Sequence, residues 1–296
     1  MGQTLILGLM TGGIYGLFAL GIALVYRGSR TFNFAQGEIG TMGLFIAFGL
    51  VERVGLPWLV GALVAILAAA LVGFVFERLV VRVMIDASRV AVAVGSVGLL
   101  MLLLAVEFKI VTVSARSLRA PIGGVGKEIL GVVVSPTHML SIGVAALVAV
   151  GLALMLKKTD FGLGVLAAAQ DPVAVRLVGV PLARVSGFVW AMGAALSALA
   201  ALLVEPTVGV FAPGYASELF LKGLAAAVVG GLTSLPGAFV GGLVVGVTEA
   251  GVSRVFASAA FPGIKSLTVL GLILCVLLFR PGGLLSGLVA KGESAS

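Results

Sequence analysis

Long apolar runs dominate this chain and limit what it can fold into. A helix needs about 20 predominantly apolar residues to cross a bilayer, and about eight such runs follow one another between Leu5 and Phe279. Hydrophobic residues make up 60% of the 296 residues and charged residues only 10%, against about 25% charge in a soluble protein. The sequence therefore predicts an all-α polytopic membrane protein with about eight transmembrane helices. We expect residues 1–296 to form a single membrane domain, with the first run a retained span and no cleaved signal peptide.

The composition argues against several other classes of protein. The net charge is +7, but the basic residues are spread over the connections between spans, where membrane topology accounts for them, so we expect no nucleic-acid partner. The single cysteine, Cys275, and the single histidine, His138, provide neither a disulfide framework nor a metal-ligand cluster. We interpret His138 as an interfacial residue. We expect no cofactor and no metal.

Sequence motifs for nucleotide binding and for hydrolysis are also missing. The chain contains no GxxxxGK[ST] loop, and the nearest stretch, Gly123 to Lys127, lacks the required spacing. It contains neither a GxSxG nucleophile elbow nor an HExxH motif. We therefore do not expect an enzyme.

The basic residues predict an orientation in the membrane. Eleven Lys and Arg residues fall in one set of alternate connections and five in the other, so the larger set belongs in the cytoplasm. This places the N-terminus outside and the C-terminus in the cytoplasm. The larger set comprises Arg27, Arg30, Arg78, Arg82, Arg89, Lys157, Lys158, Arg176, Arg184, Arg280 and Lys291; the smaller set comprises Arg53, Lys109, Arg116, Arg119 and Lys127.

The connection at residues 107–136 is too polar and too rich in glycine to cross the membrane, so we expect an extracytoplasmic loop. Two β-branched stretches, Ile110 to Val113 and Ile129 to Val134, flank the stretch Gly123-Gly124-Val125-Gly126. This pattern predicts an external β-hairpin.

The connection at residues 159–181 reads TDFGLGVLAAAQDPVAVRLVGVP and predicts a short helix on the cytoplasmic side. Asp171 is placed as its N-cap, Pro172 as its first residue and Gly179 as the residue just past its end. A helix of about two turns is marginal alone, so Val173, Ala174 and Leu177, which share a face, need a packing partner. Two interpretations remain open at this point: an ordinary connector that packs on its own chain, and a docking surface for another protein.

A second polar stretch opens the second apolar run. Asn33, Gln36 and Glu38 lie there, and a Glu costs about 2.5–3.5 kcal/mol at the centre of a membrane helix. Glu38 either faces the bundle interior or a wet cavity, or caps a helix start near the headgroups and pairs with Arg27 or Arg30. Glu249 is the other carboxylate well inside a run.

Glycines at GxxxG spacing predict close helix contacts. They occur as Gly12 with Gly16, Gly237 with Gly241 and Gly242 with Gly246.

Three stretches carry a resemblance to a known family. Residues 33–38, NFAQGE, resemble the NFAHGE signature of permease subunits of branched-chain amino acid ABC importers, with Gln36 where a His is usual. Residues 225–242 resemble the AAVLGGIGSIPGAMLGG region of the same family. Residues 162–179 resemble its coupling segment, the cytoplasmic piece that sits in a groove on the ATPase subunit.

The resemblance implies the permease subunit of an ATP-driven importer in the bacterial inner membrane that works by alternating access. It implies four kinds of partner: the lipid bilayer, a second homologous permease, two ATPase subunits that hydrolyse the ATP, and an extracytoplasmic substrate-binding protein. Alternative substrates are urea, short amides and other neutral amino acids, and an alternative class is a secondary transporter or channel that works without ATP. The implied ATPase-coupling residues are Asp171, Val173, Ala174, Arg176, Leu177 and Gly179, and the expected pathway residues are Asn33, Gln36, Glu38, Gly230, Gly241 and Glu249.

Overall fold

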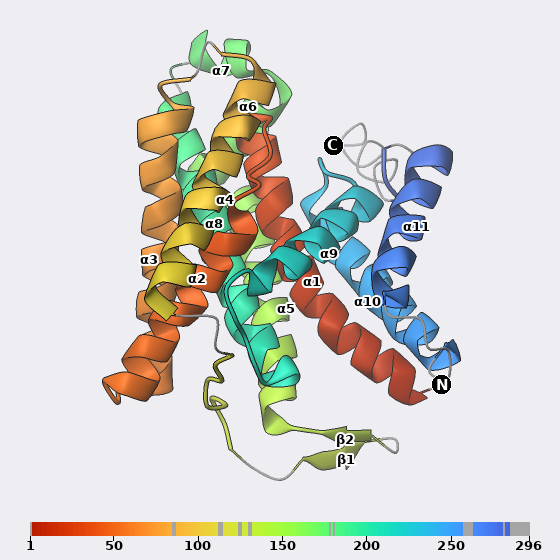
Figure 1. Ribbon diagram of the computed structural model, residues 1–296. Coiled ribbons are helices and arrows are strands. Elements are labelled where there is room, and N and C mark those ends of the chain that lie inside the picture. The colour runs from red at the N-terminus through yellow and green to blue at the C-terminus, as the bar shows by residue number, and fades with distance from the viewer. Residues whose placement is uncertain are drawn as a thin grey trace. The chain divides into compact units, whose positions relative to one another are not determined.

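The computed structural model describes residues 2–84, 87–111, 115–123, 126–129, 132–177, 179, 181–256, 263–280 and 282–284. Most of these residues are helical (Figure 1). The helices are α1 (Gly2–Ser29), α2 (Gln36–Phe48), α3 (Trp58–Phe76), α4 (Arg89–Val111), α5 (Pro136–Lys158), α6 (Asp160–Gln170), α7 (Pro172–Leu177), α8 (Leu182–Val208), α9 (Tyr215–Gly230), α10 (Leu235–Val255) and α11 (Ile264–Phe279). Two π-helical turns, η1 (Gly49–Arg53) and η2 (Glu77–Val81), extend α2 and α3, and two strands are β1 (Lys127–Ile129) and β2 (Val132–Val134).

Six helices in the described part of the chain are long and apolar enough to cross a bilayer. They are α1, α3 with η2, α4, α5, α8 and α10. The expected all-α membrane architecture is therefore present, but the expected number of about eight spans is not confirmed. The run that follows Asn33 gives only the 13 residues of α2, and α9 and α11 have 16 residues each.

The chain divides into two compact units, each described here by itself. The first unit comprises residues 1–23, 122–149 and 221–296, and the second comprises residues 24–121 and 150–220. In the second unit α2, α3 and α8 lie side by side (Figure 1). In the first unit α10 packs against α11.

Small residues let the helices of the second unit approach closely. A Cβ atom built at Gly40 of α2 would lie 2.8 Å from the Ser197 Oγ atom of α8, and one built at Gly73 of α3 would lie 2.7 Å from the Ala194 Cβ atom. Trp190 of α8 is fully buried beside Phe76, with ring centroids 5.5 Å apart. The core therefore alternates large aromatic rings with positions that only glycine fits.

The expected close glycine contacts occur in the first unit between α1 and α10. A Cβ atom at Gly12 would lie 2.8 Å from the Gly242 carbonyl oxygen, and one at Gly16 would lie 2.8 Å from the Phe239 carbonyl oxygen. A Cβ atom at Gly8, one turn earlier, would lie 2.6 Å from the Val247 Cα atom. The GxxxG spacing therefore marks a real backbone-to-backbone crossing.

The two strands pair antiparallel, with Lys127 opposite Val134, but they are not the two strands that the sequence predicts. Both lie after the glycine-rich stretch, whereas Ile110 and Val111 complete α4, so the expected strand at 110–113 is wrong over these two residues. Residues 112 and 113 lie outside those described. β-Branched residues continue an apolar helix readily because each added residue gains a hydrogen bond, whereas a new strand needs a partner.

Candidate functional site

The connection at residues 159–181 folds as two helices, α6 and α7. The expected caps of α7 are present: Asp171 Oδ1 accepts a hydrogen bond from the Ala174 N–H at 3.0 Å, and Gly179 has a positive φ of 84°. The sequence did not predict α6, although its N-cap is visible there, since Thr159 Oγ1 accepts from the Gly162 N–H at 3.0 Å. The segment is therefore a structured pair of helices.

Apolar side chains of this helix pair face away from the rest of the chain. Leu177 is 84% exposed and Leu163 of α6 is 50% exposed, whereas the ring of Phe161 packs edge-on against Phe188 of α8. Val175 is buried and holds α7 in place. The side chains of Val173 and Arg176 lie outside those that the structure describes. The docking interpretation requires such exposed apolar side chains, and it stays a prediction.

The NFAQGE stretch forms the turn that starts α2. Asn33 Oδ1 accepts a hydrogen bond from the Ala35 N–H at 3.1 Å, which fixes the turn. Gln36 is fully buried, and its backbone carbonyl oxygen accepts a hydrogen bond from the Ser197 hydroxyl. Gly37 permits a close approach, because a Cβ atom there would lie 2.9 Å from the Ala216 carbonyl oxygen. The polar residues of this motif thus anchor α2 inside the second unit.

Glu38 is fully buried and accepts a hydrogen bond from the Ser217 hydroxyl of α9. Arg30, one of its two expected partners, instead donates to the Ala169 carbonyl oxygen of α6. The interpretation that places Glu38 in the interior agrees with this geometry, and the expected Arg30–Glu38 pair is wrong.

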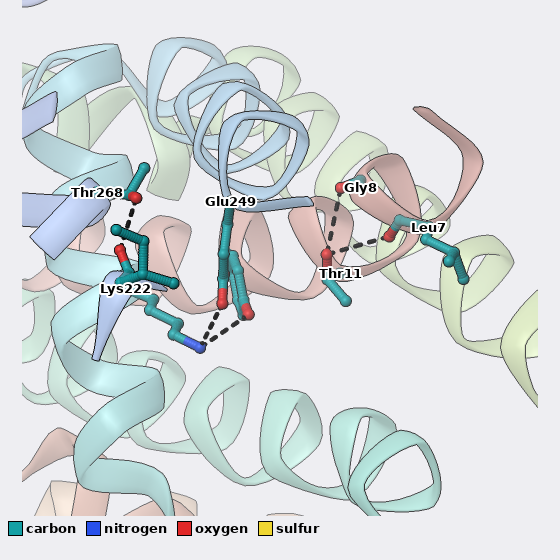
Figure 2. A network of polar contacts seen from close by, with 8 residues as sticks. Leu7, Gly8, Thr11, Lys222, Glu249 and Thr268 are labelled. Atoms are coloured by element: carbon teal, nitrogen blue, oxygen red, sulfur yellow. Dashed lines mark hydrogen bonds and ion pairs between the residues drawn. The ribbon is translucent and has the colours of Figure 1, made fainter. Parts of the chain in front are cut away.

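Glu249 lies in the first unit in a buried ion pair. Its Oε1 atom is 3.0 Å from the Lys222 Nζ atom of α9 (Figure 2). The same Nζ atom donates to the Tyr15 hydroxyl of α1 at 3.2 Å. The side chains of Lys222 and Glu249 are only 13% and 8% exposed. Lys222 therefore neutralises Glu249 inside the unit.

Gly230 and Gly241 lie where α9 and α10 touch backbone to backbone. A Cβ atom at Gly241 would lie 2.7 Å from the Gly230 backbone nitrogen. In this unit the two glycines therefore bring two helices together and leave no space for a side chain between them.

These buried polar groups and the exposed helix pair belong to a membrane protein, and its family shows which kind. The family model described as branched-chain amino acid transport system / permease component matches residues 4–278. The chain belongs to this family.

Curated relatives of the permease match it over nearly its whole length. The high-affinity branched-chain amino acid transport system permease protein BraD of Pseudomonas aeruginosa is 32% identical, with 96% of this chain and 95% of the relative covered. The corresponding permease proteins LivH of Salmonella typhimurium and Escherichia coli K12 are 29% and 28% identical, with 96% of this chain and 94% of each relative covered.

A solved structure is similar to the permease in fold only. PsaBC from Streptococcus pneumoniae in complex with Fab has a TM-score of 0.52 and 15% identity, with 93% of this chain and 91% of that chain covered.

Sequence analysis missed several polar residues of the permease because their partners come from distant segments. It assigned Glu107 to an external loop, whereas the residue is buried in α4, where its Oε2 atom accepts from the Gly214 N–H at 3.2 Å. A helical position for Glu107 could have been predicted from its apolar surroundings, LLLAVEF, which continue the preceding apolar run. Ser197 and Ser217 carry no sequence signal, since a lone serine in an apolar run has many roles.

Proposed function

We propose that the permease forms the translocation pathway of an ATP-driven ABC importer for branched-chain amino acids in the bacterial inner membrane. Its partners in this proposal are the lipid bilayer, a second homologous permease, two ATPase subunits and an extracytoplasmic substrate-binding protein. The observation that carries the proposal is the family match over residues 4–278. The full-length similarity to permeases named for branched-chain amino acid transport supports the substrate class.

The helix pair α6–α7 couples the permease to the ATPase in this proposal. A helix of six residues is unstable on its own, yet α7 is capped at its start by Asp171 and exposes Leu177 almost fully. A hydrophobic groove on the ATPase would bury Leu177 together with its neighbours Val173 and Ala174. ATP-driven closure of the ATPases then moves the helix pair and switches the access of the pathway.

A double substitution tests the coupling. Val173→Asp with Leu177→Asp would place two charges in the apolar groove, so we expect a folded permease without substrate-stimulated ATP hydrolysis and without uptake. Val54→Asp is a matched control, since Val54 is 66% exposed and lies in the connection between α2 and α3. Asp171→Ala should be milder, because loss of an N-cap costs about 1 kcal/mol. Normal stimulation in the double variant would refute docking through α7.

The proposed substrates are leucine, isoleucine and valine. The proposed pathway residues are Asn33, Gln36 and Glu38 of the second unit and Gly230, Gly241 and Glu249 of the first unit. A sparse set of polar groups in apolar walls suits a zwitterion with an apolar side chain. Selection would lie largely in the binding protein.

Uptake of labelled leucine into vesicles that contain the complete complex tests both substrate and class. We expect uptake that requires ATP and the binding protein. Uptake of urea or short amides in place of leucine would refute the substrate, and leucine uptake without ATP would favour a secondary transporter or channel.

A further inference from the structure

Two carboxyl groups from different helices meet in the interior of the second unit. Glu38 of α2 is 0% exposed and Glu107 of α4 is 1% exposed. Both carboxyl groups bind the start of α9 within three residues of each other, Glu38 at Ser217 and Glu107 at Gly214, which places them side by side. The two residues are far apart in the sequence, and only the packing of α2 against α4 brings them together.

Each carboxyl group has one oxygen with a donor and one without. Glu38 Oε1 accepts from the Ser217 hydroxyl, and Glu107 Oε2 accepts from the Gly214 N–H at 3.2 Å. Neither Glu38 Oε2 nor Glu107 Oε1 receives a hydrogen bond from an N–H or O–H group of the described chain. A buried oxygen without a donor is costly, and one proton held between two neighbouring carboxyl groups provides a donor for them.

The surroundings of the pair accommodate one negative charge better than two. The donors aimed at the pair come from the start of α9, where the helix dipole gives a partial positive charge. The Glu107 carboxyl group is buried, and the groups beside it are Glu38 and the Gly214 N–H. The charged residues nearest along the packed helices, Lys109 of α4 and Glu218 of α9, are exposed. Two adjacent buried carboxyl groups do not both ionise under such conditions.

We propose that Glu38 and Glu107 bind a single proton between them, so that one carboxyl group donates to the other. The proton is taken from water, and the resulting O–H···O bond satisfies both orphan oxygens. It joins α2 to α4 and, through Ser217 and Gly214, to the start of α9. The pair is a proton-binding site of the permease, whichever substrate the permease transports.

Infrared difference spectroscopy of the purified permease in lipid nanodiscs at neutral pH tests this site directly. The wild-type protein should show the carbonyl stretch of one protonated carboxyl group that disappears in Glu107→Gln and also in Glu38→Gln. The double variant should lose that same single band and one carboxylate band. Glu77→Gln is the matched control, because Glu77 is equally buried but ion-paired with Arg82 at 3.0 Å, and it should lose only a carboxylate band.

Several outcomes would overturn the proposal. If neither single variant loses a carboxyl band, both groups are ionised, as they would be around a bound sodium ion. If the double variant loses two carboxyl bands, each group holds its own proton. An alkaline titration of the wild-type protein, labelled with ¹³C-glutamate, gives a second measurement that needs no variant: loss of one carboxyl band with gain of one carboxylate band supports the shared proton, and an unchanged spectrum refutes it.

Discussion

Single glycines determine how closely α1 and α10 approach in the first unit. The Gly242 position has no room for a methyl group, since a Cβ atom there would lie 2.7 Å from the Gly12 carbonyl oxygen. Gly251 lies on the same helix with open space around its Cβ position. The two glycines therefore form a matched pair of substitution sites.

We expect Gly242→Ala to destabilise the first unit by about 1–3 kcal/mol, the usual cost of overpacking. Gly251→Ala should leave stability unchanged or raise it by up to about 1 kcal/mol, because alanine favours a helix more than glycine does. Thermal unfolding of the purified variants measures both. Equal effects of the two substitutions would mean that the α1–α10 contact does not depend on backbone proximity.

The buried ion pair gives a second prediction at the residue scale. Lys222→Met leaves the Glu249 carboxylate without its cation, and breaking a buried pair in this way costs about 3–5 kcal/mol. The double variant Lys222→Met/Glu249→Gln removes both charges and should recover most of this loss. A double-mutant cycle by thermal unfolding gives the coupling energy. Additive losses would show that the two charges do not interact.

The sequence indicates which residues are unusual but not their partners. Glu38 and Glu249 stand out as carboxylates in apolar runs, and their burial follows from the cost of exposing them to lipid. Their partners Ser217 and Lys222 both come from α9. Ser217 lies 179 residues from Glu38, and Lys222 lies 27 residues from Glu249. No local pattern encodes that pairing, because it arises from how the helices pack.

At the scale of elements, local capping signals identify the short helices well. Asp171, Pro172 and Gly179 predict α7 correctly because caps act over three or four residues. The number of spans and the position of the β-hairpin are harder to predict. Both depend on where an apolar run stops being a helix, and no cap marks that point in residues 107–115.

The segment that follows α4 is held to the second unit by a carboxylate. Glu52 Oε1 accepts from the Arg119 backbone N–H at 3.0 Å and from its Nε atom at 3.1 Å. The Arg119 backbone N–H, followed by its guanidinium group, holds the pKa of Glu52 below its usual value. The folded state therefore binds this proton less readily than the unfolded chain, so the tether is complete above pH of about 4.3 and weakens as the pH falls through the lowered pKa.

A spin label at Ser117, in a Cys275→Ala background, reports this tether. We expect a restricted label at neutral pH that becomes mobile as the solution is acidified below the usual carboxyl range. In Glu52→Ala the label should be mobile at every pH. A label that stays restricted in Glu52→Ala would show that two other contacts hold the segment without Glu52: Glu205, which accepts from the Leu118 N–H at 3.0 Å, and Phe211, which pairs with Arg116.

At the scale of the whole molecule, two expectations from the sequence conflict with each other. Each span carries the chain to the other side of the membrane, so eight spans would leave both termini on the same side. The charge count instead places the two termini on opposite sides. The count of eight is the one that the structure does not confirm. Opposite sides require an odd number of spans, which the six long helices together with three shorter ones would give.

Hydrogen bonds within the second unit link connections that the charge count places on the same side of the membrane. Arg30 binds the Ala169 carbonyl oxygen, and Arg82 binds the Ala183 carbonyl oxygen at 2.9 Å. All four residues lie in or beside connections that the charge count places in the cytoplasm. In the other group, residues 116–119 bind Glu52, Glu205 and Phe211. These hydrogen bonds thus group the connections as the charge count does, and which group faces the cytoplasm stays a prediction.

This topology predicts different labelling of two single-cysteine variants. In a Cys275→Ala background, Ser117→Cys should react with an impermeant maleimide added to cells stripped of any outer membrane, because residue 117 is exposed in the external group. Ser88→Cys, exposed before α4 in the cytoplasmic group, should react only after the membrane is opened. The reverse pattern would invert the permease. It would place α7 and its exposed Leu177 outside the cell, where no ATPase subunit could reach them.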